Sequence, residues 1–205
     1  MEIDYIEIIA AVLGLIGIFL QIKQHPLYWL TSILMVSLYI YVFYNSKFYA
    51  DMSFQFYYLV ISIYGWTYWI KDTRLKKINS RTENVNINIK IDKPQKLSVK
   101  KLKLKHLFIS IIISLVLWVL IYIILDRFTN SDVALGDSFT TALSIVATFL
   151  LARKYIENWI FWIIVDFIST ILYVSKGLYP TAILFIVLTI LAFVGFFKWK
   201  NRKET

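Results

Sequence analysis

The sequence predicts an all-α integral membrane protein with seven transmembrane helices, arranged as two parallel three-helix repeats joined by one further helix. Three observations lead to this fold class. First, 59% of the 205 residues are hydrophobic and the mean hydropathy is +0.66, whereas globular domains are roughly 45–50% apolar. Second, several apolar runs reach the ~20 residues that cross the hydrocarbon core of a bilayer. Third, the first three runs and the last three share one residue spacing.

Helices are the expected form of these runs, because irregular backbone cannot face lipid. The first run follows Met1-Glu2-Ile3-Asp4 without a basic region or a small-residue cleavage site, which predicts a retained span and not a signal peptide. The fifth run is the shortest. In order, the expected spans are residues 4–22, 27–45, 49–70, 106–126, 136–152, 155–175 and 178–198.

These spans divide the chain into four parts. A first three-helix bundle is expected over residues 1–70 and a second over residues 136–205, with a linker transmembrane helix at 106–126. Residues 71–105 are expected to form a basic cytoplasmic loop. The loop contains NVNINIKI, whose alternation could form a short strand. It also contains KLSVKKLKLKH, which could lie along anionic headgroups or simply be solvated.

The distribution of Lys and Arg predicts which side of the membrane each loop occupies. Counted over alternate sides, one side carries 19 of these residues and the other carries 3. Cytoplasmic loops collect Lys and Arg, so the N-terminus is expected outside and the C-terminus in the cytoplasm. Topology thereby explains the net charge of +9, and no nucleic-acid partner is expected.

A shift of 130 residues aligns the first three spans with the last three without a gap. Matched Trp and Gly in one register indicate an internal duplication. The aligned pairs include Phe19 with Phe149, Leu20 with Leu150, Lys23 with Arg153, Trp29 with Trp159, Tyr49 with Tyr179, Gly65 with Gly195, and Trp69 with Trp199. Because three spans are an odd number, span 106–126 restores the original direction and gives a 3+1+3 arrangement of parallel repeats. Such repeats are a transporter architecture, with substrate held near the midplane where the repeats meet.

The stretch ENWIFWIIVD, residues 157–166, places an acid inside an apolar span. At about 100° per residue, one helix face carries Asn158, Trp159, Trp162, Asp166 and Tyr173. Asp166 lies about halfway along its span, where a carboxylate costs at least ~2.5 kcal/mol. No Lys or Arg lies at comparable depth. Indoles beside an acid suit a flat, positively charged aromatic ring, since cation–π attraction adds ~2 kcal/mol when desolvated.

The span 49–70 carries a second polar face with Gln55, Tyr58 and Ser62. Gln55 lies deep enough to need hydrogen-bond partners. These groups are candidates for substrate contact. The alternative is that they hold helices together, as Gln and Ser side chains often do in membranes.

The sequence gives no sign of enzymatic or cofactor chemistry. The chain has no cysteine, which excludes disulfides and thiolate metal sites. Its two histidines, His25 and His106, are far apart, so no metal is expected. No Ser–His–Asp set or phosphate-binding loop is visible, and the last span has no lysine before Lys198 that could hold retinal. We therefore expect neither an enzyme nor a cofactor.

With these residues assembled, the chain resembles the PnuC family of bacterial vitamin transporters, most familiar as nicotinamide riboside transporters. The resemblance covers nearly the whole chain outside residues 71–105. It rests on the combination of ENWxxWxxxD with YGWxxW. These motifs lie in FYADMSFQFYYLVISIYGWTYW (48–69) and ARKYIENWIFWIIVD (152–166), and SKGLYPTAILF (175–185) adds to them.

The resemblance implies a multi-pass protein of the bacterial inner membrane with SWEET-like bundles, often trimeric. Such carriers move nicotinamide riboside by facilitated diffusion, and a cytoplasmic kinase traps it by phosphorylation. Carried over residue by residue, the substrate contacts would be Gln55, Asn158, Trp159, Trp162 and Asp166. Thiamine and riboflavin importers share the scaffold, and thiamine stays open as a substrate because it is also a ring cation. A proton-coupled carrier with Asp166 as the titrating group is a further alternative.

Overall fold

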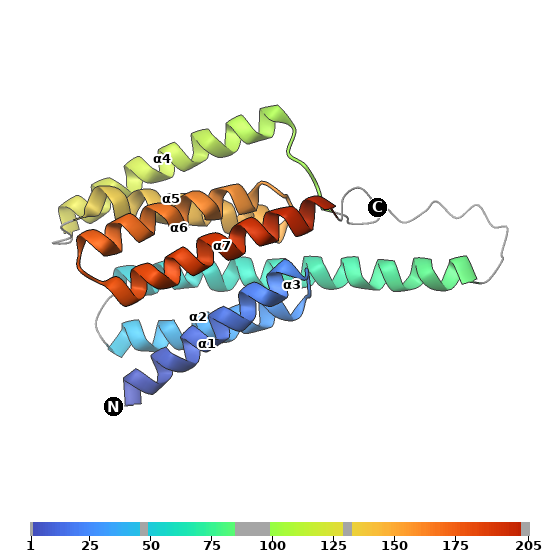
Figure 1. Ribbon diagram of the computed structural model, residues 1–205, viewed down its shortest axis with the longest axis horizontal. Helices are drawn as coiled ribbons and strands as arrows, with labels where there is room; N and C mark the ends of the chain where they lie inside the picture. The colour runs from blue at the N-terminus through green and yellow to red at the C-terminus, as the bar shows by residue number, and fades with distance from the viewer. Residues whose placement is uncertain (1, 46–48, 85–98, 129–132, 202–205) are drawn as a thin grey trace. The chain divides into compact units, whose positions relative to one another are not determined.

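A computed structural model describes residues 2–45, 49–84, 99–128 and 133–201, which are mainly helical (Figure 1). The chain divides into two compact units, unit 1 with Met1–Ser98 and unit 2 with Val99–Thr205. Unit 1 is a bundle of three helices, in which α2 contacts both neighbours. The helices are α1 (Glu2–Ile22), α2 (Leu27–Asn45) and α3 (Tyr49–Asn84).

Unit 2 has four helices in its described residues, and each packs against the next one in the sequence. They are α4 (Leu104–Phe128), α5 (Ala134–Ala152), α6 (Asn158–Ser175) and α7 (Tyr179–Asn201). All seven predicted helices are therefore found in the described residues, most of them within three residues of the predicted ends. The sequence prediction of an all-α fold is confirmed.

The third helix is longer than the sequence predicts. We expected it to end at residue 70, but α3 continues to Asn84 and has 36 residues, so the first part of the predicted loop 71–105 is helical. The sequence has neither glycine nor proline between Gly65 and Pro94. Lys, Arg and Leu are good helix formers, so nothing stops the helix where the polar residues begin. NVNINIKI, apart from its first residue, lies outside the described residues.

Five of the described helices are long and apolar enough to cross a membrane, namely α2, α4, α5, α6 and residues 181–201 of α7. Seven spans were predicted. Of the other two helices, α1 contributes the shorter apolar stretch Val12–Ile22, and α3 is not among the five. Helix α4 has the reverse of the burial pattern of a helix in a soluble protein. It buries the polar residues Ser110 and Ser114, while isoleucines such as Ile112 are exposed. Each serine hydroxyl donates to the carbonyl of the residue four positions earlier, at 2.9 Å. Apolar side chains directed outward are expected of a lipid-facing helix.

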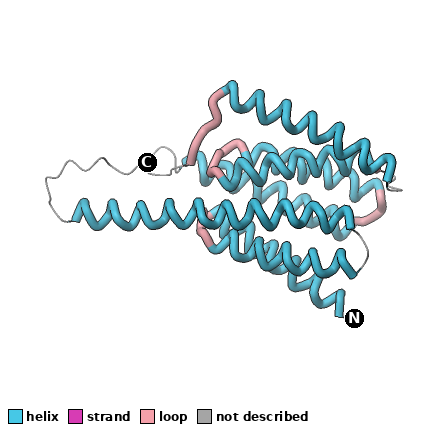
Figure 2. The backbone as a smooth tube through the Cα atoms, turned by 180° about the vertical axis from the view of Figure 1, so that it is seen from behind, coloured by secondary structure: helices cyan, strands magenta, loops and turns pink. Residues whose placement is uncertain are grey.

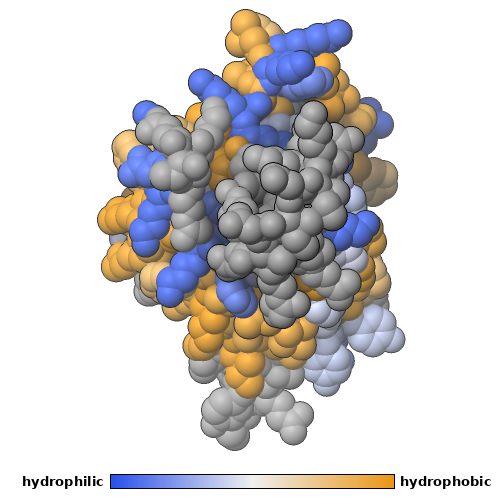
Figure 3. All heavy atoms as spheres, turned by 90° about the vertical axis from the view of Figure 1, so that its right-hand side faces the viewer, coloured by the Kyte–Doolittle hydropathy of each residue, from blue (hydrophilic) through white to orange (hydrophobic). Residues whose placement is uncertain are grey.

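The surface agrees with this reading. Figure 3 shows many exposed hydrophobic side chains on the face in view, with hydrophilic residues among them. Inside unit 2, α5 is the most buried helix, and its residues form a core with α6. The cluster consists of Leu143, Val146, Ala147, Leu150, Phe161 and Val165.

The first sign of the duplication is the geometry of two turns, one between α1 and α2 and the other between α5 and α6. Gln24 and Lys154, 130 residues apart, have φ angles of 58° and 59°. In each turn the next residue donates its backbone N–H at 2.9 Å to a carbonyl five residues back, from His25 to Leu20 and from Tyr155 to Leu150. A left-handed residue with this bond is a Schellman helix ending. The same non-glycine ending occurs in both units.

The second sign is a pair of tryptophans in each unit. The rings of Trp29 and Trp69 meet edge to face with centroids 5.5 Å apart at 88°, and Trp159 and Trp199 have the same separation and angle. All four indoles are fully buried. The register inferred from the sequence therefore corresponds to a shared local structure.

A glycine faces each of these tryptophan pairs. A Cβ atom added at Gly65 would lie 2.4 Å from the Trp29 ring, and one added at Gly195 would lie 2.4 Å from the Trp159 ring. Such distances are well inside van der Waals contact, so only glycine fits at either position. The matched glycines are explained by close packing of an indole on the helix backbone.

Candidate functional site

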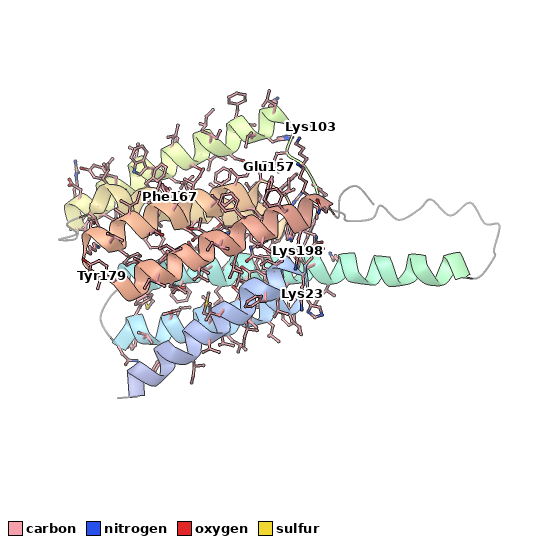
Figure 4. The ribbon with its side chains drawn as sticks, viewed as in Figure 1. Lys23, Lys103, Glu157, Phe167, Tyr179 and Lys198 are labelled. Carbon is pink, nitrogen blue, oxygen red and sulfur yellow. The ribbon has the colours of Figure 1, made fainter. Side chains whose placement is uncertain are left out.

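Three polar side chains form a row along α6, and we call Asn158, Trp162 and Asp166 the α6 row. They are spaced four residues apart, so they lie above one another on one helix face. Asn158 is 0% exposed and Asp166 is 5% exposed, while Trp162 is half-buried against the core cluster. Phe167, labelled in Figure 4, follows Asp166 on another side of the helix and is exposed.

The α6 row has hydrogen-bonding capacity that the protein leaves unused. The Asn158 amide nitrogen donates to the Tyr155 carbonyl at 2.6 Å, but its oxygen Oδ1 is buried without a partner. The indole nitrogen of Trp162 is likewise buried without an acceptor. Within the described residues the carboxylate of Asp166 has no hydrogen bond or ion pair. Buried polar groups are nearly always paired, so three such groups in one row indicate a place for a ligand.

No fixed cation in the helices of unit 2 lies near the depth of Asp166. The sequences of α5 and α6 contain neither Lys nor Arg, and those of α4 and α7 have them only near the helix ends. Lys176, just after α6, lies 3.8 Å from Asp137 in the first turn of α5. The charge of Asp166 is therefore available for a mobile partner.

Trp159 has a packing role in the structure. Its ring is fully buried against Trp199 and Gly195, in the same geometry that Trp29 has in unit 1. Its indole nitrogen is buried without an acceptor, and so is that of Trp29. The pattern is common to both repeats, so it does not by itself distinguish a ligand site.

The other predicted residues of the site lie in different surroundings. Tyr173 stacks on Phe185 of α7, with ring centroids 5.1 Å apart and 17° between the planes. In unit 1, the hydroxyl groups of Ser62 and Ser32 are hydrogen-bonded at 2.9 Å, which links α3 to α2. Tyr58 packs edge to face on its neighbour Tyr57, and Gln55 is half-buried.

The α6 row is special to the second repeat. At the equivalent positions of α2 the chain has Tyr28, Ser32 and Val36. Val36 is buried, so the first repeat places an apolar side chain where the second places Asp166. The two repeats therefore differ on this helix face: it is polar in α6 and mainly structural in α2.

Sequence reasoning missed two polar side chains beside the row. Ser169 is buried one turn after Asp166, and helical periodicity could have found it, because it falls on the same face. Glu157 is also buried, but it precedes α6 and no periodicity identifies it. Within the described part of the chain, no group of three His, Asp or Glu side chains could hold a metal ion.

Comparison with known proteins agrees with this picture of the fold. Residues 4–201 match the protein family described as nicotinamide mononucleotide transporter. The chain belongs to this family. One relative is the nicotinamide riboside transporter PnuC of Escherichia coli (strain K12). It is 25% identical over 213 residues, which cover 98% of this chain and 87% of the relative.

Two further family members extend the comparison. The nicotinamide riboside transporter PnuC of Neisseria mucosa (strain ATCC 25996 / DSM 4631 / NCTC 10774 / M26) is 26% identical over 167 residues, covering 81% of this chain and 58% of the relative. A crystal structure of the vitamin B3 transporter PnuC matches with a TM-score of 0.69 at 21% identity. The match covers 97% of this chain and 81% of that one. The resemblance to the PnuC family is thus confirmed. Its members are named as transporters, and this chain is a multi-pass membrane transporter and not an enzyme.

Proposed function

We propose that the chain carries nicotinamide riboside across the bacterial inner membrane by facilitated diffusion. A cytoplasmic kinase then phosphorylates the substrate and traps it. The family membership and the names of the relatives support the substrate. Thiamine is the alternative substrate. We further propose that the two repeats adopt the parallel 3+1+3, SWEET-like arrangement, with the N-terminus outside and the C-terminus in the cytoplasm, and that the protein assembles as a trimer.

The observation that carries the proposal is the unpaired polar chemistry of the α6 row. Nicotinamide riboside is a pyridinium cation that also carries a carboxamide and ribose hydroxyl groups. In the proposed complex the ring stacks on Trp162, and Asp166 supplies the counter-charge. Asn158 Oδ1, buried without a partner, accepts a hydrogen bond from the carboxamide or a hydroxyl group. The Asn158 oxygen and the Asp166 carboxylate then each have a matching group on the ligand.

The proposed substrate-binding site also includes residues outside the α6 row. Trp159 packs on Trp199 of α7 and so holds in place the helix that carries the row. Tyr173 lies two turns beyond Asp166 on the same helix. The remaining proposed contacts, from α3 of unit 1, are Gln55, Tyr58 and Ser62.

Replacing Trp162 and Asp166 together with alanine should reduce the affinity for nicotinamide riboside by at least about 100-fold. The change removes the stacking surface and the buried counter-charge, and a buried charge partner alone is worth about 3–5 kcal/mol. Isothermal titration of purified protein measures the effect. Titrating thiamine in parallel decides between the two ligands. Unaltered binding of nicotinamide riboside by the double variant would refute the site.

Uptake into proteoliposomes tests the transport mechanism. Empty vesicles should fill with nicotinamide riboside only to the external concentration, while vesicles loaded with a nicotinamide riboside kinase and ATP should accumulate the phosphorylated product. An imposed pH gradient should leave the final level in empty vesicles unchanged. Accumulation driven by that gradient would instead support a proton-coupled carrier.

A further inference from the structure

A short segment before α4 is attached to the turn between α5 and α6, and we call residues 99–103 the strap. Its Lys100 donates its backbone N–H to the carbonyl of Lys154 at 2.9 Å and accepts from the N–H of Ile156 at 2.9 Å. These two bonds flank Tyr155 and make a parallel bridge. Figure 2 shows the loop between α5 and α6 beside the segment that leads into α4.

Glu157 fastens the other end of the strap. The backbone N–H of Leu102 donates to both carboxylate oxygens of Glu157, at 3.1 Å each. Glu157 is only 6% exposed, whereas Leu27, at the equivalent position of the first repeat, is 47% exposed. A charged hydrogen bond of this kind contributes about 1.5–3 kcal/mol. Glu157 and Lys103 lie at the same end of unit 2 in Figure 4.

The strap is also packed and not merely hydrogen-bonded. The side chain of Val99 is buried, and so is that of Ile156 in the turn. The side chain of Leu102 packs on the core cluster of α5 and α6. Three consecutive features therefore hold the strap in one place: an apolar anchor, a backbone bridge and a carboxylate.

The strap is connected to the α6 row through one carbonyl group. The amide nitrogen of Asn158 donates to the carbonyl of Tyr155 at 2.6 Å. The peptides on either side of Tyr155 are the ones bonded to Lys100, so the strap fixes the direction of this carbonyl. The direction of the carbonyl sets the orientation of the Asn158 amide and hence of its free oxygen Oδ1.

We propose that Glu157 and the strap form a clamp that positions Asn158 for the substrate. Glu157 is a positioning residue in this proposal, because it acts through the turn and does not touch the ligand. The clamp belongs to the second repeat, as the α6 row does. The inference rests on the proposed function for its effect on transport, whereas the docking of the strap can be tested without any substrate.

Glu157→Leu, which installs the residue of the first repeat, should raise the half-saturation concentration for nicotinamide riboside uptake about tenfold. A tenfold change matches the loss of one charged hydrogen bond at the lower end of its usual strength. The maximal rate should change less than twofold, which a general loss of folded protein would not produce. Glu157→Gln keeps an acceptor for the N–H of Leu102 but loses its charge, and Glu157→Asp withdraws the carboxylate by one methylene. Both variants should therefore fall between the wild type and Glu157→Leu.

The absence of cysteine from the sequence allows a test that needs no transport. In purified protein, Val99→Cys should react with a maleimide at least about tenfold more slowly than Lys101→Cys, because local opening must precede labelling of a docked segment. Lys101 is exposed and serves as the matched control. Adding Glu157→Leu should remove most of the protection at position 99 and leave position 101 unchanged.

The outcomes separate the two proposals. Equal reactivity at positions 99 and 101 in the otherwise unchanged protein, or protection that survives both Glu157→Leu and Glu157→Asp, would overturn the clamp. Faster labelling with an unchanged half-saturation concentration would overturn its role in positioning Asn158. Absence of nicotinamide riboside uptake by wild-type protein with normal protection of position 99 would contradict the proposed substrate and leave the docked strap supported.

Discussion

Asp166→Val should weaken nicotinamide riboside binding by at least about 100-fold and should also raise the unfolding temperature of the protein. Both effects have one cause. A buried carboxylate without a partner is unfavourable in a membrane helix by at least ~2.5 kcal/mol, and valine removes this penalty. Valine is the residue at the equivalent position of the first repeat, where Val36 is buried, so the side chain is compatible with this helix face. The cation of the ligand, however, loses its counter-charge, which is worth about 3–5 kcal/mol in a buried pair.

Isothermal titration and thermal unfolding of the purified protein measure the two effects. Asp166→Asn retains the shape of the side chain and removes only the charge, so it should lose most of the affinity while its stability also rises. Asp126→Asn is the matched control, because Asp126 is exposed near the end of α4 and should change neither quantity. Wild-type affinity in Asp166→Val would show that the carboxylate does not pair with the substrate. A lower unfolding temperature would show that Asp166 has a stabilising partner.

Asp166 lowers stability in exchange for ligand binding. This explains why the corresponding helix faces of the two repeats differ in polarity. A duplication initially gives two equal helix faces, and a ligand site needs only one polar face. In α2 the hydroxyl group of Ser32 is satisfied by Ser62, and Val36 is apolar. In α6 the corresponding positions are held by Trp162, whose indole nitrogen is buried without an acceptor, and by the buried acid Asp166. Natural proteins often retain such unsatisfied groups where function requires them.

The helices could be predicted from sequence because lipid leaves few alternatives for an apolar run of this length. The end of α3 could not, because its boundary was placed where hydropathy falls, and a helix can continue beyond that point when no glycine or proline interrupts it. The matched Trp and Gly positions were found from their spacing. The physical reason for these matches, an indole packed on a glycine backbone, is visible only in the folded structure.

The candidate site was predicted in part. Periodicity brought Asn158, Trp162 and Asp166 onto one face, and the structure confirms that they form a row. Periodicity also placed Trp159 near this face, although its ring packs against α7. The contact between Glu157 and Leu102 joins residues 55 positions apart, outside any helical repeat. Contacts of this kind depend on how the strap folds back, which no local pattern in the sequence encodes.

Trp159→Ala and Trp29→Ala should destabilise the protein by similar amounts, about 3–5 kcal/mol each, because each removes a fully buried indole and leaves a cavity. Each ring packs on the matched tryptophan and the matched glycine of its own unit with the same edge-to-face geometry. The two losses of stability should therefore be closer to each other than to the losses at other tryptophans. Trp162→Ala, which removes a half-buried ring, should cost much less stability but most of the affinity for nicotinamide riboside.

Thermal unfolding in detergent, combined with titration of each variant, separates packing from recognition. A tryptophan common to both repeats is expected to serve the scaffold, whereas one found only in the second repeat is expected to serve the ligand. Trp29 therefore acts as an internal control for Trp159. If Trp159→Ala kept its stability and lost only binding, Trp159 would be a direct ligand contact. Trp29 and Trp159 would then have different roles despite their equivalent packing. If Trp162→Ala bound normally, the stacking surface would have to be sought on another helix.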